Sequence, residues 1–407
     1  MTSSDIVLGL GGTVDYEIEW DSSVLEALVA EYGIRADELD AAAPIADERA
    51  LVVSLLGLLR SGSGGERYVA SSGIVERFAA RFERRITLGG TGVRAAFAMR
   101  VLGVTSTLHL VSIDDHVRRL LPEGCPWISS ATHDSTDPHL IVQFPTGARV
   151  RVPDASGAVV DLVAAHPNRL IYSNDPPNQT LYLSDELPAA LAAARIFLIS
   201  GFNSMRDAAA LTQRLDELRA DMAWLPSDAL VMYEDSGFHM PGFSAQVRTA
   251  LLDRIDVYSL NEDELEGYLD RRVDLLDPAQ VRSALHDIRA VVPARTLLVH
   301  TKHWSAVLGE EAERHRTALA GGIQMASTRY RYGDGFQRTD YEAMALERQN
   351  PGGIEVAREL ARTSPATVVI PAYLLDDPAP TTIGLGDTFV GGFIAATVMR
   401  GSSDHLL

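Results

Sequence analysis

In the second half of the chain, apolar runs of strand length alternate with amphipathic stretches of helical length. The apolar runs lie at 195–200, 229–234, 257–260 and 296–301, and the helical patterns at 205–220, 243–252 and 278–291. Strands and helices in regular alternation predict a mainly parallel sheet with helices on both faces. The pattern therefore indicates an α/β fold of three layers.

The first half of the chain mixes helical patterns with short strands. An apolar run at 6–10 predicts a buried strand, and the segment from 106 to 175 changes to short alternating strands. Helical patterns lie at 22–32, 48–60, 75–84 and 93–102, and the short strands at 107–111, 140–144, 149–152 and 169–172. We expect one domain spanning residues 1–407, with segments 14–20 and 138–175 inserted as a small β-rich sheet that covers the site. His133, His139 and His166 fall here without metal-ligand spacing, so we expect them at the surface.

Composition and charge narrow the class of protein. The chain has 407 residues, 46% hydrophobic and 22% charged, as in ordinary globular proteins. Its formal net charge of −19 disfavours nucleic acid and anionic membranes as partners. The single cysteine, Cys125, excludes an internal disulfide. We see no signal peptide and no run approaching the roughly 18 apolar residues of a membrane span. We therefore expect a cytoplasmic protein, of open oligomeric state.

A glycine-rich turn near the C-terminus carries the strongest chemical signal. Gly384-Leu385-Gly386-Asp387 precedes an apolar helical stretch. Glycines let backbone amides approach an anion, and a helix start presents unpaired N–H groups, so the two together form a phosphate site. Asp387 is then placed to accept a proton from an attacking hydroxyl, although an aspartate here also serves simply to cap a helix.

The same helical stretch contains the pair Gly391-Gly392. Glycine inside a helix costs about 1 kcal/mol relative to alanine. Close backbone packing or the approach of a ligand would explain that cost.

Near the N-terminus, glycines 9, 11 and 12 follow the first predicted strand. A dinucleotide-binding fingerprint would need a glycine where Val14 stands, and a helix directly afterwards, whereas 15–20 alternates like a strand. A nicotinamide-dependent dehydrogenase is therefore a distant alternative. Asp15 instead follows the strand at the edge where ligands collect in open parallel sheets, and its carboxylate suits sugar hydroxyls. A turn aspartate is the alternative reading.

A further glycine pair, Gly89-Gly90, precedes the helix predicted at 93–102. These residues are expected to contact substrate through backbone amides, or else simply to start the helix.

Acidic residues follow two of the predicted parallel strands. Glu234 ends one strand, and the cluster from Asn261 to Glu264 ends the next. Parallel strands bring these ends to one edge, where oxygen ligands would hold Mg²⁺ beside a nucleotide phosphate, in part through waters. Helix capping explains Asn261 equally well. No Walker A motif is present, which excludes the P-loop class.

Taken together, these motifs resemble a known family. Gly384-Leu385-Gly386-Asp387 resembles the G-x-G-D signature of the ribokinase-like superfamily, and the motif order resembles the ADP-dependent glucokinase and phosphofructokinase family. The segment 261–264 matches that family's N-x-x-E motif, and 298–301 resembles its strand leading into the nucleotide site. Gly89-Gly90 and the segment 168–171 also follow in the expected order.

The resemblance implies a ribokinase-like three-layer α/β sandwich with a β-rich lid, and phosphoryl transfer from Mg-ADP to a hydroxyl of glucose or fructose 6-phosphate. It implies these roles: Asp387 as base with Gly384, Leu385 and Gly386 as anion hole; Asp15, Gly89, Gly90 and Arg169 at the substrate; His300, Thr301 and Thr382 at the nucleotide; Asn261, Glu264 and Glu234 at Mg²⁺.

Three features depart from the family pattern. The segment 9–15 stands where the family usually shows an asparagine-containing stretch, which leaves the substrate open. The family's H-x-E motif appears as Met232-Tyr233-Glu234, without its histidine, and the chain ends at Leu407, soon after the catalytic helix. The missing histidine and the short C-terminus leave a non-catalytic sugar- or nucleotide-binding protein open as an alternative. An ATP-dependent ribokinase-like carbohydrate kinase is a further alternative, since ATP is the donor in most of the superfamily. A phosphorylated sugar would need a cationic pocket, for which the candidates are Arg149, Arg151 and Arg169.

Overall fold

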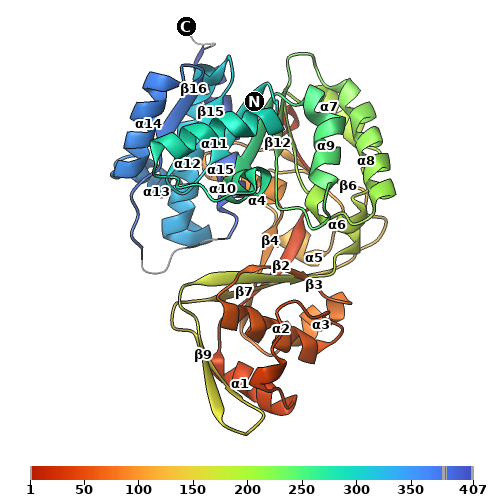
Figure 1. The fold of residues 1–407 in the computed structure, drawn as a ribbon. Coiled ribbons are helices and arrows are strands. Elements are labelled where there is room, and N and C mark those ends of the chain that lie inside the picture. Colours follow the sequence, from red (N-terminus) through yellow and green to blue (C-terminus); the bar gives the residue numbers. More distant parts are fainter. Residues whose placement is uncertain (1, 378–380, 382, 405–407) are drawn as a thin grey trace.

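The computed structural model describes residues 2–377, 381 and 383–404, and it divides into a larger and a smaller unit (Figure 1). The larger unit is built on a nine-stranded sheet with the order β16-β15-β14-β13-β12-β11-β1-β5-β6. Its strands are β1 (Ile6–Leu8), β5 (Thr107–Leu110), β6 (Trp127–Ser129), β11 (Ile196–Ile199), β12 (Leu230–Glu234), β13 (Val257–Asn261), β14 (Thr296–His300), β15 (Trp304–Leu308) and β16 (Thr367–Pro371). All neighbours pair in parallel except β14 with β15 and β15 with β16.

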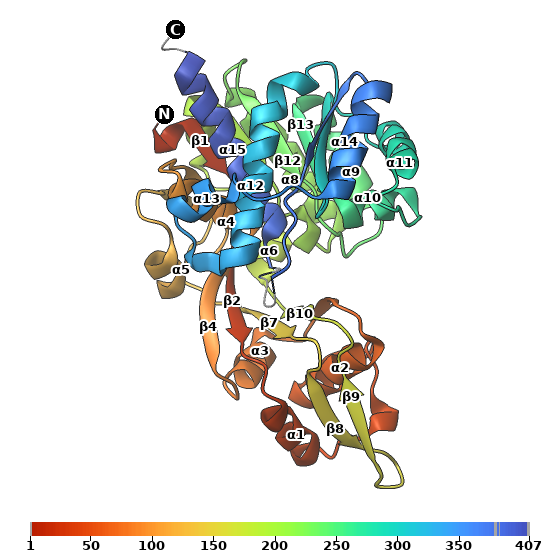
Figure 2. The ribbon, with the colours of Figure 1, turned by 90° about the vertical axis from the view of Figure 1, so that its left-hand side faces the viewer.

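Helices cover both faces of this sheet and make three layers. One face packs against α4 (Thr91–Val101), α12 (Arg316–Tyr332) and α15 (Leu385–Asp404) (Figure 2). The other face packs against α7 (Leu187–Ala193), α8 (Ala208–Asp221), α9 (Phe243–Leu251), α10 (Glu262–Leu269), α11 (Pro278–Val291) and α14 (Pro351–Thr363). The short helices α5 (Asp115–Leu120), α6 (Pro176–Thr180) and α13 (Arg338–Met344) lie in connections. No helix in the described ranges is both long enough and apolar enough to cross a membrane.

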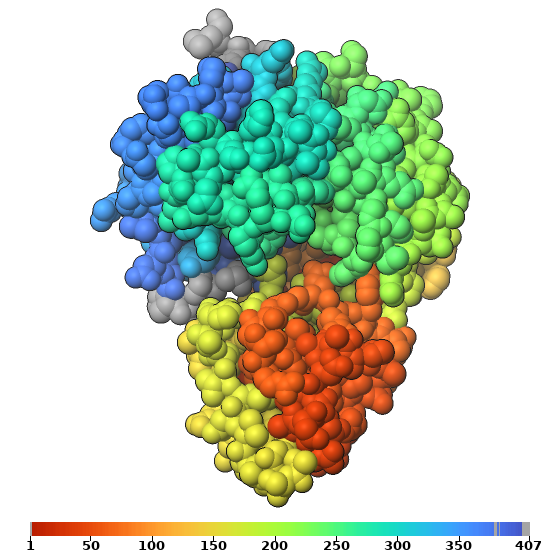
Figure 3. Space-filling model, viewed as in Figure 1, coloured from red at the N-terminus to blue at the C-terminus, as the bar shows by residue number. Residues whose placement is uncertain are grey.

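The smaller unit is built on a second sheet with the order β3-β10-β7-β2-β4. Its strands are β2 (Thr13–Ile18), β3 (Gly65–Tyr68), β4 (Arg84–Gly89), β7 (His139–Phe144) and β10 (Asn168–Ser173). The hairpin β8 (Arg149–Pro153) and β9 (Val159–Val163) and the helices α1 (Ser22–Glu31), α2 (Glu48–Ser61) and α3 (Ser72–Ala79) complete it. The segments expected to form a lid supply β2, β7, β10 and the hairpin, whereas β3, β4 and the three helices come from the chain between those segments. The surface is hollowed where the two units meet (Figure 3).

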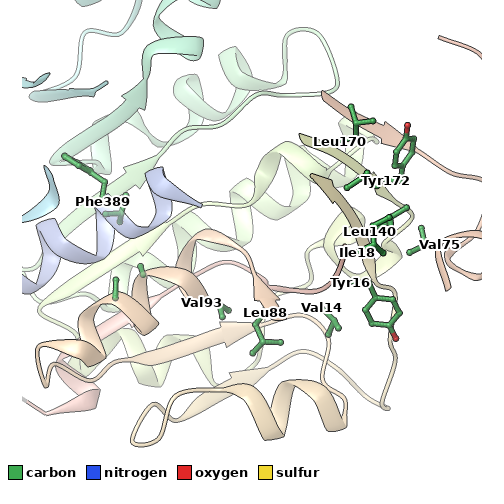
Figure 4. Packing of buried hydrophobic residues seen from close by; sticks show 14 of the residues in the cluster. Val14, Tyr16, Ile18, Val75, Leu88, Val93, Leu140, Leu170, Tyr172 and Phe389 are labelled. Atoms are coloured by element: carbon green, nitrogen blue, oxygen red, sulfur yellow. The ribbon is translucent and has the colours of Figure 1, made fainter. Parts of the chain in front are cut away.

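One hydrophobic cluster runs through both units. In the smaller unit, Tyr16 of β2 and Leu140 of β7 belong to it (Figure 4). Leu88 of β4 and Val93 of α4 continue it to Phe389 of α15. Because β2 and β4 lead from one unit into the other, burial of these side chains fixes the second sheet beside the start of α15.

The glycine pair inside α15 allows three helices to approach closely. A Cβ on Gly391 would lie 2.6 Å from the carbonyl oxygen of Ala95 in α4, and a Cβ on Gly392 would lie 2.5 Å from that of Gly321 in α12. Close packing therefore explains these glycines, in line with one of the two readings from the sequence.

We expect Gly391→Ala to lower the free energy of unfolding by about 1–2 kcal/mol, because overpacking outweighs the gain in helix propensity. Gly267→Ala is the matched control, since a Cβ at this position of α10 meets no described atom within 4 Å. It should raise the free energy by up to about 1 kcal/mol. Denaturant unfolding of both variants tests this; equal effects at the two positions would contradict the packing argument.

Candidate active site

The glycine-rich turn lies at the N-terminal end of α15, close to where β2 and β4 leave the larger unit (Figure 2). Gly384 has a left-handed backbone with φ of 62°, which glycine adopts without strain. A Cβ on it would lie 2.5 Å from Nη1 of Arg329 and 2.6 Å from Cδ of Arg94. Both the conformation and the neighbouring arginines therefore require a glycine here.

Residues after the turn begin the helix and present its free amides. Leu385 and Gly386 open α15, and Asp387 follows in the first turn with its side chain 25% exposed. Thr388 donates its backbone N–H (3.0 Å) and its hydroxyl (2.8 Å) to the carbonyl oxygen of Gly384. Thr388 thus fixes the carbonyl group of Gly384. The first backbone N–H groups of the helix have no acceptor within the helix and can bind an anion.

Asp15 and Asp387 share one cation. Nη2 of Arg94 donates to Oδ2 of Asp15 at 2.8 Å, and Nε of Arg94 lies 3.8 Å from Oδ2 of Asp387. Thr13 donates its hydroxyl to the other oxygen of Asp15 at 2.7 Å. Burial opposes the charge of Arg94, but Asp15 and Asp387 outweigh it and raise the arginine pKa. The structure thus brings together Asp387, the predicted base, and Asp15, the predicted substrate-binding residue. Arg94, which the sequence analysis did not single out, contacts both.

Gly89 and Gly90 have packing reasons to be glycine. The carboxylate of Asp15 lies over Gly89, where a Cβ would collide with it. Gly90 has φ of 91°, and a Cβ on it would lie 2.9 Å from the Cα of Gly12. Both residues therefore stand at the predicted place and shape the surroundings of Asp15.

A second chain of charges links the two units. Arg85 of β4 donates to Glu17 of β2 at 2.7 Å and lies 2.8 Å from Asp334 in the larger unit. Asp334 accepts from Arg329 of α12 at 2.6 Å, and Arg329 donates to the hydroxyl of Thr388 at 3.2 Å. Burial would raise the pKa of Asp334, but Arg329 and Arg85 lower it overall. This series of side-chain contacts connects the smaller unit to the glycine-rich turn.

His300 and Glu234 form a buried pair behind the turn. Nε2 of His300 lies 2.9 Å from Oε1 of Glu234, and its ring stacks on Phe389 with centroids 4.7 Å apart. A Cβ on Gly386 would lie 3.2 Å from Cε1 of His300, so the pair adjoins the predicted anion hole. Burial would lower the pKa of His300, but Glu234 and the nearby Glu264 raise it above its ordinary value.

The predicted metal residues differ in what they offer a cation. Oε2 of Glu234 is buried and accepts no hydrogen bond from any described residue, so it suits Mg²⁺ or a bound water. Asn261, by contrast, caps α10 by accepting from the backbone amides of Asp263 and Glu264, and Glu264 accepts from the amide of Asn261. Burial raises the pKa of Glu264 to about 8, helped by Glu234. Among the described residues, no group of three His, Cys, Asp or Glu could hold a metal alone.

Three further predicted residues remain to be placed. Thr301 uses its hydroxyl to accept from the amides of His303 and Trp304, which closes the turn between β14 and β15. Arg169 is exposed on β10. Thr382 lies outside the described residues.

Of the cationic candidates, Arg149 and Arg151 are held in the hairpin rather than in the site. Arg149 pairs with Asp161 of β9 at 2.6 Å, and Arg151 pairs with Glu26 of α1 at 2.7 Å. Each of them is exposed and already neutralised.

The sequence reasoning missed Arg94, Arg329 and His139. His139 is not a free surface residue, because its Nε2 lies 3.0 Å from Asp175, and it pairs with Asp15 across β7 and β2. Attraction by Asp175 outweighs burial and raises the pKa of His139. An arginine among small apolar residues at the start of a helix was the available signal for Arg94.

Comparison with known proteins identifies the family to which this chain belongs. The sequence matches the ADP-specific phosphofructokinase/glucokinase conserved region over residues 4–395. The chain belongs to this family. The family predicted from the motifs is confirmed, and with it a kinase that uses ADP as phosphoryl donor.

Solved structures agree with this family in their fold. A hypothetical ADP-dependent phosphofructokinase from Pyrococcus horikoshii OT3 has a TM-score of 0.78 and 16% identity, covering 99% of this chain and 100% of that one. A phosphofructokinase from the same organism, solved with AMP, has a TM-score of 0.77 and 16% identity, covering 98% of each chain. An ADP-dependent kinase solved with fructose-6-phosphate and ADPβS has a TM-score of 0.70 and 13% identity, covering 98% of this chain and 95% of that one. The predicted three-layer α/β sandwich with a mainly parallel sheet is confirmed. The comparison with curated proteins gave no match.

We expect Glu234→Gln to lower the pKa of His300, because the largest of the charges that raise it is lost while burial remains. Histidine NMR titration measures this. His315 is the internal control, since it also stacks on a phenylalanine of α15 but burial lowers its pKa to about 4. Because the pKa of His300 is raised by folding, the pair stabilises the protein below the unfolded value and less as pH rises. An unchanged His300 titration would contradict the pairing.

Proposed function

We propose that the chain transfers a phosphoryl group from Mg-ADP to a hydroxyl of glucose or of fructose 6-phosphate, with Asp387 as general base. The position of Asp387 is the main support. It stands in the first turn of α15 behind the glycine-rich turn, and it shares Arg94 with Asp15. A base beside a phosphate site and a carboxylate suited to sugar hydroxyls are what this reaction needs.

On the donor side, the amides of Gly384, Leu385 and Gly386 would stabilise negative charge on the transferred phosphoryl group. Asp387 would take the proton of the attacking sugar hydroxyl while the hydroxyl oxygen forms a bond to the transferred phosphorus. The bond between that phosphorus and the oxygen of AMP breaks, and AMP leaves with its electron pair. His300 and Thr301 come from the neighbouring strand end and are proposed at the nucleotide, together with Thr382.

On the acceptor side, Asp15 would accept hydrogen bonds from sugar hydroxyls, with Gly89 and Gly90 beside it. Arg169 lies farther along the second sheet and is proposed to contact the substrate from there. The smaller unit acts as a lid in this proposal, since it carries Asp15 and stands over the carboxyl ends of the parallel strands (Figure 1). Closing the site against water suppresses hydrolysis of the nucleotide.

A phosphorylated sugar needs a cationic group near the acceptor site. Arg206 is a candidate where the two units meet, and its guanidinium lies 3.9 Å over the ring of Tyr68 in β3. One structural relative was solved with fructose-6-phosphate. We therefore propose both glucose and fructose 6-phosphate as acceptors, and the activity assay described below distinguishes them.

Mg²⁺ fits this site as a cation shared with the nucleotide. Glu234 would hold it directly or through a water, because its free buried oxygen lacks another partner in the described chain. Asn261 and Glu264 would act only through waters, since their side chains already cap α10. When bound, the ion supplies neutralisation of phosphate charge.

The first test is coupled phosphorylation of glucose and of fructose 6-phosphate, each with Mg-ADP and Mg-ATP. We expect activity with ADP, and Asp387→Asn should lower kcat by about 10²–10⁴-fold because general-base catalysis is lost. Nucleotide affinity, measured by calorimetry, should stay within a few-fold. Asp115→Asn is the control, an aspartate in the first turn of α5 whose side chain is fully exposed.

Near-native turnover of Asp387→Asn would contradict its role as base. Activity with ATP alone would favour an ATP-dependent carbohydrate kinase, and nucleotide binding without activity in any of the four combinations would favour a binding protein.

A further inference from the structure

Helix α4 delivers a buried arginine into the space between the acceptor and donor sites. Arg94 is the fourth residue of α4, and its side chain is 7% exposed. A buried guanidinium is stable only with anionic partners. The partners of Arg94 are Asp15 from the smaller unit and Asp387 from α15, which come from opposite ends of the chain.

Its contacts with the two carboxylates differ in kind. The contact with Asp15 is a hydrogen bond of 2.8 Å, and Asp15 is itself fixed by the hydroxyl of Thr13. The contact with Asp387 is an ion pair at 3.8 Å, which attracts the carboxylate without a short hydrogen bond. Arg94 is therefore anchored at Asp15 and acts on Asp387 as a fixed charge.

Arg94 also lies against the glycine-rich turn. Its Cδ and Nη1 would lie 2.6 and 2.9 Å from a Cβ on Gly384. The second arginine at this turn, Arg329, is engaged with Asp334 and Thr388 and so supports the far side of the turn. Only Arg94, of these two, lies between the base and the carboxylate at the acceptor side.

We propose that Arg94 is a positioning residue for phosphoryl transfer: anchored on Asp15, it holds the carboxylate of Asp387 toward the hydroxyl that attacks. This rests on the proposed role of Asp387 as base. A positive charge beside that carboxylate also offsets its repulsion from the phosphoryl oxygens, so that two anionic groups can approach each other.

The proposal predicts a loss in turnover rather than in nucleotide binding. Misplacing a catalytic group by about 1 Å can cost about 10²-fold in rate. Arg94→Ala should therefore lower kcat by about 10²-fold while the KM for Mg-ADP stays within a few-fold, since Arg94 acts on Asp387 and not on the nucleotide.

Three further measurements separate this role from a structural one. Arg94→Lys keeps the charge and should recover part of kcat. Methylguanidinium added at non-denaturing concentration should restore part of the activity of Arg94→Ala. Arg100→Ala is the matched control on the same helix; Arg100 is exposed and donates to the backbone oxygen of Glu123. It should leave kcat unchanged and gain nothing from methylguanidinium.

Arg94→Ala with kcat within threefold of the unchanged enzyme would overturn the proposal, as would a loss that lies wholly in KM. If Arg94→Ala does not fold, Arg94→Lys decides: folded protein with kcat no better than Asp387→Asn overturns it, and partial activity supports it. Absence of ADP-dependent activity in the unchanged enzyme would instead overturn the proposed function, and the role of Arg94 with it.

Discussion

A guanidinium buried from water has to keep its anionic partners, and this constraint organises the centre of the molecule. Arg94 lies on α4, Asp15 on β2 of the smaller unit and Asp387 at the start of α15. The hydrogen bond from Arg94 to Asp15 joins the two units, and its loss would leave the buried guanidinium without its nearest anionic partner. This ion pair therefore favours the position of the second sheet over the glycine-rich turn. Burial of the hydrophobic cluster along β2 and β4 offsets the free-energy cost of burying these charged groups.

Small residues occur where charged groups or helices come close. Gly89 leaves room for the carboxylate of Asp15, and Gly384 leaves room for two guanidinium groups. Gly391 lets α4 lie against α15, which brings Arg94 to the end of the helix that carries Asp387. The charges and the glycines therefore depend on each other, because a larger residue at any of these positions would displace a carboxylate, a guanidinium group or a helix.

The alternation of strands and helices was enough to predict most of the parallel part of the large sheet, although not β6, and the turn at 384–387 was enough to find the start of α15. The strands β15 and β16 were missed because both pair antiparallel, which β-α alternation does not signal: β15 follows β14 through a tight turn, and β16 returns to β15 only after α12, α13 and α14. Arg94 was missed because a charged residue on a helix is usually solvated. Only tertiary packing shows that its side chain is buried between two carboxylates distant in sequence.

The central claim is that Asp387 works as a base held in place by Arg94. A double-mutant cycle in kcat with Arg94→Ala, Asp387→Asn and the double variant tests it most directly. If Arg94 acts through Asp387, removing Arg94 slows the unchanged enzyme strongly but has little further effect once Asp387 is asparagine. If instead the two losses multiply in the double variant, the residues act independently and the claim is wrong.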